Sequence, residues 1–354
     1  MVGQEIIIGI TYKTEIYMKF KQYILPIAAL TLMGLSTLTA CSDWTDEENI
    51  TLQQPGIDEQ NPEAYAHYLS NLRAYKTAPH KIVYGWFDNS QKTPSSRAHH
   101  FADVPDSLDV VVVSTPQLAD FELQDKEQLA NKGTRLFFNI SYDNLLKAHT
   151  AAVKEGSETR DFATYLSDQL SSLLAAEGPF DGLVAEYRGS SPIYMSEAEK
   201  TAAKQLQDAF FGAISTWKQA HADKHLTFAG YPANLISQSL LAEVDHIILP
   251  TQGATDEEQL GIEAMQALIA QGVPSDRFLF AASTVSMDAT DKTTGFYGER
   301  RALSEAAYWM TEPCTAYTRA GLSVLQIQND YYNATCTYQY LREAIQIMNP
   351  APVK

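Results

Sequence analysis

From residue 80 onward, short apolar runs rich in β-branched residues alternate with longer segments of helical periodicity. Runs such as Val110-Val111-Val112-Val113 are apolar at every position, which is typical of strands buried on both faces of a parallel sheet. The predicted strands are 81–87, 108–114, 134–141, 180–186, 226–231, 244–251, 278–284 and 321–328. The predicted helices are 61–75, 122–131, 161–176, 197–222, 235–242, 256–271, 301–310 and 337–348. Eight strands, each followed by a helix or by a loop long enough for one, predict a single-domain (β/α)8 TIM barrel.

A doubly wound open sheet is the alternative fold, but no glycine-rich phosphate loop follows the first predicted strand. The formal net charge of -17 disfavours nucleic acid and anionic membrane surfaces as partners and fits a neutral ligand. His99-His100 and the other histidines lack metal-ligand spacing, and no Gly-x-Ser-x-Gly motif is present. We therefore expect neither a metal nor a cofactor.

The first 41 residues have the features of a bacterial targeting segment. Met18-Lys19-Phe20-Lys21 is basic, and residues 24–38 are apolar but too short for a membrane span of about 20 residues. Leu38-Thr39-Ala40-Cys41 resembles a lipobox, in which Cys41 is lipidated, and translation could start at Met1 or Met18. The acidic residues that follow resemble the surface-export signal of Bacteroidetes lipoproteins. We expect a signal segment at 1–41, a flexible tether at 42–60, a barrel at 61–350, and a cell-surface protein that a lipid anchors to the outer membrane.

Two further cysteines, Cys314 and Cys336, fall at opposite ends of the predicted barrel. The eighth strand between them spans about 20 Å at roughly 3.3 Å per residue. A disulfide needs Cα atoms within about 7 Å. The sequence therefore predicts two free thiols.

Ligands of such barrels bind at the C-terminal ends of the strands. Aromatic and amide side chains are frequent there, and they suit a carbohydrate, because rings stack on sugar CH groups while amides and carboxylates bond hydroxyls. The strand ends place Trp86, Phe87, Asp88, Asn89, Ser114, Ser141, Tyr142, Asp143, Glu186, Tyr187, Arg188, Tyr231, Asn234, Gln252, Asp288, Gln328, Asn329, Asp330, Tyr331 and Tyr332 at this rim. The predicted binding residues are Trp86, Ser141, Tyr142, Glu186, Arg188, Tyr231, Gln252, Gln328, Asp330 and Tyr331.

Several strands resemble those of family 18 glycoside hydrolases, the chitinase and endo-β-N-acetylglucosaminidase group, in particular the Bacteroidetes lipoprotein branch. The first is Ile82-Val83-Tyr84-Gly85-Trp86-Phe87, and the sixth is Val244-Asp245-His246-Ile247-Ile248-Leu249. The third, residues 134–141, ends in the serine that precedes the family's usual Gly-Gly, which here is Tyr142-Asp143. The resemblance covers residues 80–348 and implies a TIM barrel and a glycan ligand.

The fourth strand departs from the family motif Asp-Gly-x-Asp-x-Asp-x-Glu. Asp181 and Gly182 match it, Val184 and Glu186 replace the second and third Asp, and Arg188 replaces the final Glu. In the family the sugar's own acetamido oxygen attacks C1, the last Asp orients that group, and the Glu is the general acid and base. A guanidinium keeps its proton near neutral pH and cannot fill that role. Residues two apart share one side of a strand, so we expect Glu186 to pair with Arg188.

Three functions remain open from the sequence. The preferred one is a glycan-binding lipoprotein that has lost hydrolysis, with Arg188 donating hydrogen bonds or meeting an acidic sugar such as sialic acid or a uronate. The second is an active endo-glycosidase on N-acetylglucosamine-containing glycans, with Glu186, or a carboxylate such as Asp143, Asp288 or Asp330, as relocated acid. The third is a structural scaffold in an outer-membrane glycan-uptake complex, which would bind no glycan.

Overall fold

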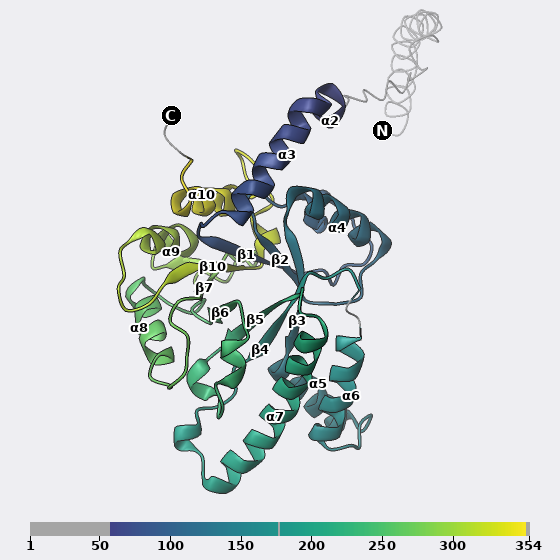
Figure 1. The fold of residues 1–354 in the computed structure, drawn as a ribbon, viewed down its shortest axis with the longest axis vertical. Helices are drawn as coiled ribbons and strands as arrows, with labels where there is room; N and C mark the ends of the chain where they lie inside the picture. Colours follow the sequence, from purple (N-terminus) through teal and green to yellow (C-terminus); the bar gives the residue numbers. More distant parts are fainter. Residues whose placement is uncertain (1–56, 176–177, 352–354) are drawn as a thin grey trace, which may run out of the picture. The chain divides into compact units, whose positions relative to one another are not determined.

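The computed structural model describes residues 57–175 and 178–351 and confirms the predicted parallel barrel (Figure 1). The strands close in the order β1-β10-β7-β6-β5-β4-β3-β2, and every neighbouring pair is parallel. Their bounds are β1 (Ile82–Phe87), β2 (Val110–Val113), β3 (Arg135–Ser141), β4 (Gly182–Tyr187), β5 (His225–Gly230), β6 (His246–Leu249), β7 (Phe278–Ser283) and β10 (Arg319–Leu325). The predicted signal segment and Cys41 lie outside the described residues.

The chain divides into a unit that ends at Pro62 and a unit that begins at Glu63. In the first, the structure describes the short helix α2 (Ile57–Gln60). The other helices are α3 (Pro62–Thr77), α4 (Asp120–Lys132), α5 (Tyr142–Glu155), α6 (Phe162–Leu174), α7 (Glu197–Ala220), α8 (Glu258–Ala267), α9 (Ala302–Thr311) and α10 (Gln339–Met348). A two-stranded hairpin, β8 (Phe296–Tyr297) and β9 (Arg300–Arg301), precedes α9. Within the described ranges, no helix is both long and apolar enough to cross a membrane.

One predicted helix is wrong, and one observed helix was not among the predictions. Residues 235–242 do not form an α-helix; only the 3-10 turn η7 (Ser239–Ala242) lies there. Ser237 and Ser239 bond each other through their hydroxyls, and such local side-chain bonds compete with a helix. Conversely, α5 was not predicted, although the Ser141 hydroxyl caps its start and Gly156 ends it in the left-handed conformation.

The barrel interior is filled by side chains that alternate inward along the strands. They form a cluster of their own, separate from the larger core between the strands and the helices. Its buried members are Tyr84, Val110, Val112, Phe137, Val184, Ala229, Ile248, Leu279 and Ala281. These side chains close the barrel from within, and residues further along several strands, such as Asn139 on β3 and Glu186 on β4, line a cavity at the mouth.

Cys314 and Cys336 are both free, which confirms the prediction of two thiols. Cys314 is half-buried after α9, whereas Cys336 is exposed between β10 and α10.

Candidate functional site

A cavity of about 250 Å³ lies at the C-terminal ends of the strands, directly above the interior cluster. We call it the central cavity. Its lining consists of Trp86, Ser114, Asn139, Asn144, Glu186, Arg188, Ala229, Gly230, Ile248, Pro250, Gln252, Ala281 and Leu325. Four of the predicted binding residues therefore converge here: Trp86, Glu186, Arg188 and Gln252.

Glu186 and Arg188 form the charged pair that the strand alternation predicts. Arg188 Nε donates to Glu186 Oε1 at 3.3 Å, and Asn139 Nδ2 donates to Glu186 Oε2 at 3.0 Å. With the Gln252 amide oxygen facing Arg188, that oxygen accepts from Nη1 and Nη2, each at 3.2 Å. The carboxylate thus has a donor on each oxygen, and the guanidinium is held on two sides.

The backbone around Arg188 is fixed as well. Its N–H donates to Asp143 Oδ2 at 2.8 Å, and its carbonyl accepts from Asn234 Nδ2 at 2.7 Å. Asp143, one of the candidate relocated acids, therefore holds the β4 loop from the first turn of α5. Of the residues that line the central cavity, Glu186 carries the one carboxylate.

Two polar groups of the lining have definite orientations. Trp86 Nε1 donates to Ser323 Oγ at 2.7 Å, which fixes the indole at the mouth. Asn139 uses its amide N–H on Glu186, whereas its Oδ1 is buried and accepts no hydrogen bond within the described residues. An unsatisfied buried acceptor is costly, by about 1–3 kcal/mol.

The remaining predicted binding residues are placed elsewhere. Gln328 lines a neighbouring cavity of about 630 Å³, the side cavity, which shares Trp86, Ser114 and Leu325 with the central one. Asp330 lines a third, smaller pocket. Four others line none of these three spaces: Ser141, Tyr142, Tyr231 and Tyr331.

Local contacts explain why these side chains turn away. Ser141 is the cap of α5 and accepts from Asn144 N at 3.3 Å. Tyr142 starts that helix and packs in the outer core against Tyr187, where burial raises the pKa of its hydroxyl. Tyr331 is also in the outer core, with its ring against Tyr338.

With this geometry established, comparison with known proteins gives a family. The sequence profile described as "Glycoside hydrolase family 18, BT1044-like" matches residues 45–347. The chain belongs to this family. The resemblance predicted from the sequence is thereby confirmed. No curated protein matches the chain in sequence.

Solved structures of family 18 proteins share the fold. A glutamate-to-glutamine variant of BT1044 is 15% identical, with a TM-score of 0.60, over 83% of this chain and 95% of its own. The apo endo-β-N-acetylglucosaminidase from Cordyceps militaris is also 15% identical, with a TM-score of 0.56, over 80% of this chain and 96% of its own. At this identity the likeness concerns the barrel alone.

Asp181 and Gly182, which match the motif that the sequence resemblance implies, make structural contacts. Asp181 pairs with Lys126 and accepts from Leu136 N at 2.8 Å, which ties β4 to β3. A Cβ at Gly182 would lie 2.7 Å from both the His225 carbonyl and the Phe137 ring, so only glycine fits. Asp181 and Gly182 therefore have packing roles that do not depend on catalysis.

Asn139 and Asn144 are the polar lining residues that the sequence prediction missed. Asn139 lies within β3, and a polar residue inside an otherwise apolar strand was the available signal. Asn144 belongs to α5, and without that helix its position could not be assigned.

Proposed function

We propose that this family 18 chain is a glycan-binding protein that has lost hydrolysis, that is, a pseudoenzyme. The observation that carries the proposal is Arg188, which stands in the catalytic Glu position of the family motif and pairs with Glu186 in the central cavity. A permanent cation cannot protonate a glycosidic oxygen or activate water. It also places positive charge beside an oxocarbenium-like transition state, which needs negative charge.

The other two acidic positions of the motif do not supply a general acid either. Val184, in the position of the second Asp, is fully buried in the interior cluster. Glu186 already accepts from Arg188 and Asn139, and it lies about 6.6 Å along the strand from position 188 at roughly 3.3 Å per residue. General acid catalysis requires contact within about 3 Å of the leaving oxygen. These features support binding without cleavage.

The cavity keeps features suited to a sugar. Trp86 offers a fixed aromatic face, and Asn144 and Gln252 bring amide groups to the same lining. Amide groups suit the acetamido group and the hydroxyls of a sugar. We infer that the ligand contains N-acetylglucosamine, as a host or microbial glycan would.

Calorimetric titration with an N-acetylglucosamine oligosaccharide tests binding. We expect a saturable isotherm for the wild type and at least tenfold weaker binding for Trp86→Ala, because the stacking surface is lost. Tyr308→Ala is the matched control, because Tyr308 is an exposed aromatic on α9 outside the cavity lining. No binding by the wild type would contradict the proposal and favour a structural scaffold in an uptake complex.

The alternative function is an active endo-β-N-acetylglucosaminidase with Glu186 as relocated acid. It is favoured by one observation: Glu186 is the carboxylate of the central cavity, with 17% of its side chain exposed. Mass spectrometry of an N-glycoprotein after incubation with the wild type distinguishes the two. Glycan release that disappears in Glu186→Gln would establish the hydrolase.

We also propose that lipid on Cys41 anchors the protein to the outer membrane with the barrel at the cell surface. The lipobox-like Leu38-Thr39-Ala40-Cys41 and the acidic stretch after it support this location. We expect that detergent is needed to extract the wild-type protein from the membrane fraction. We also expect that protease added to intact cells digests the barrel. Cys41→Ala should abolish lipid incorporation, and unchanged incorporation would contradict the anchor.

A further inference from the structure

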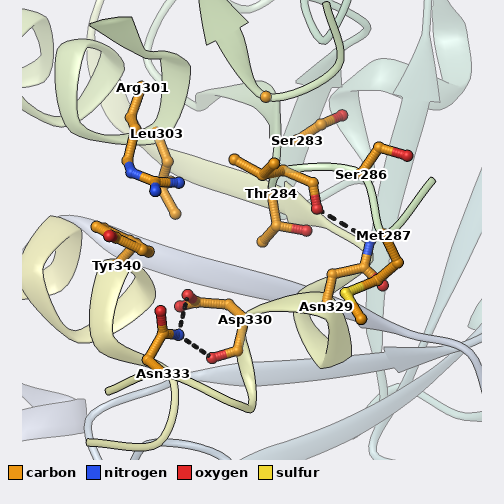
Figure 2. Close-up of a pocket in the computed structure, with 12 residues that line it drawn as sticks. Ser283, Thr284, Ser286, Met287, Arg301, Leu303, Asn329, Asp330, Asn333 and Tyr340 are labelled. Carbon is orange, nitrogen blue, oxygen red and sulfur yellow. Dashed lines mark hydrogen bonds between the residues drawn. The ribbon is translucent and has the colours of Figure 1, made fainter. Parts of the chain in front are cut away.

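The third pocket holds a cation, Arg301, that has no hydrogen-bond partner in the part of the chain that the structure describes. This space of about 170 Å³, the Arg301 pocket, lies among the β7 loop, the start of α9 and the segment between β10 and α10. In Figure 2, Arg301 extends toward Tyr340 and Asp330 on the facing segment. The Arg301 guanidinium stacks 3.7 Å from the centroid of the Tyr340 ring, which holds its plane in place.

The bonding of Arg301 differs from that of its neighbour. Arg300 pairs with Glu305 and Glu257. Among residues 57–175 and 178–351, the Arg301 guanidinium has ring contacts with Tyr340 and Phe296 but neither a hydrogen bond nor an ion pair. Its N–H donors at the pocket therefore have room for an acceptor.

The carboxylate in the same lining does not meet this need. Asp330 is 5% exposed, and its oxygens accept from Leu341 N and Asn333 Nδ2, each at 2.8 Å. Burial raises the pKa of Asp330 and the charge of Arg301 acts to lower it, but the two side chains form no ion pair in the described chain. The pocket thus joins a held guanidinium to uncommitted polar groups such as the Ser283 and Tyr340 hydroxyls.

The central cavity also holds one arginine and one carboxylate, but there the two are directly paired. There Glu186 balances Arg188, and Gln252 takes two more of the donors of that arginine. An acidic sugar at Arg188 would have to displace these partners, whereas an acidic group at Arg301 would displace none. A neutral sugar suits the centre, and an anionic one suits the Arg301 pocket.

The pockets also adjoin one another. The Arg301 pocket shares Ser283 and Ser286 with the side cavity, and the side cavity shares Trp86, Ser114 and Leu325 with the central cavity. One extended ligand could therefore contact all three spaces.

On the basis of the proposed function, we propose that the Arg301 pocket is a second subsite that binds a carboxylate-bearing sugar of the glycan held at the central cavity. Arg301 would donate two parallel hydrogen bonds to the carboxylate, a geometry that the guanidinium fork allows. The acidic-ligand role that the sequence suggested for Arg188 is thereby assigned to Arg301.

Calorimetry with a matched pair of probes tests the subsite: an N-acetylglucosamine-containing N-glycan with terminal sialic acid, and the same glycan after its removal. We expect the wild type to bind the acidic form about tenfold more tightly, with the preference declining at high salt. Arg301→Gln should abolish the preference without weakening the neutral glycan. Arg300→Gln, the same charge change one residue away, should leave the preference intact.

Equal affinity of the wild type for the two glycans would overturn the subsite, as would a preference that survives Arg301→Gln. A preference abolished by Arg188→Gln but not by Arg301→Gln would assign the acid to the centre instead. If neither glycan binds, the proposed function itself is wrong. Arg301→Lys is a second test in case the Gln variant misfolds. It keeps the positive charge but not the guanidinium fork, and it should retain part of the preference for the acidic glycan.

Discussion

At the scale of single residues, β4 separates the packing roles of the family motif from its catalytic roles. Asp181 and Gly182 keep contacts that any version of this barrel needs, with Leu136 and with Phe137. The proposed function assigns the loss of catalysis to Val184 and Arg188, neither of which makes these two contacts. The proposed loss is therefore compatible with an intact fold and barrel mouth.

Restoring the second motif carboxylate should be costly in this chain. Val184 is fully buried among apolar side chains such as Phe137 and Ile248, so Val184→Asp would place a carboxyl group in the interior cluster. We expect the free energy of unfolding to fall by about 3 kcal/mol or more at pH 7, because burial penalises the ion. Urea unfolding measures this. Val184→Ala is the control for the lost side-chain volume. An Asp variant as stable as the Ala variant would contradict a cost from burying the carboxylate.

At the scale of elements, the site depends on how each strand leads into the next segment. β4 continues into a loop in which the Arg188 backbone is hydrogen-bonded to the side chains of Asp143 and Asn234. β3, in contrast, leads directly into α5 at Ser141. The segment after β10 is organised around Asp330, whose carboxylate accepts from the first turn of α10. Polar residues at strand ends therefore often hold the neighbouring elements instead of facing the cavity.

Asp330 should contribute mainly to stability. Asp330→Ala removes the acceptor of the buried Leu341 N–H, and we expect a loss of about 2 kcal/mol in urea unfolding. Asn333→Ala is the control: it removes a donor to Asp330 but leaves Leu341 paired, so the loss should be smaller. Equal losses in the two variants would show that the bond to α10 is not the main contribution.

At the scale of the whole molecule, the barrel and its mouth were predictable because they follow from strand periodicity. Fully apolar strands imply burial on both faces, and alternation along β4 places Glu186 and Arg188 on the same side. The directions of Tyr142 and Tyr331 were not predictable, because past the end of a strand the local turn decides where a side chain points. Tyr142 faces the outer core because it starts α5, a helix that is not among the predicted ones.

The barrel also contains a histidine that links its stability to pH. His246, at the start of β6, lies near Tyr84, whose hydroxyl is 3.2 Å from its Nδ1. Burial lowers the pKa of His246 from 6.5 to about 4, although Asp245 acts in the opposite direction. The unfolded chain therefore binds this proton more readily than the folded one. The corresponding stability is present above about pH 6.5 and is lost as the pH falls toward 4.

Comparison with His246→Gln isolates this contribution, because other groups titrate in the same range. Burial lowers the pKa of His80, but the hydrogen bond and the charge interaction with Asp109 outweigh burial and leave the pKa raised. His80 therefore stabilises the folded state below pH 6.5. In the wild type this gain partly masks the loss that comes from His246. Between pH 7 and 4, we expect the free energy of unfolding to fall by about 3 kcal/mol more in the wild type than in His246→Gln. Urea unfolding at four pH values measures the difference. Parallel curves would mean that His246 is protonated alike in both states, and the barrel interior would then be wetter at β6 than its packing implies.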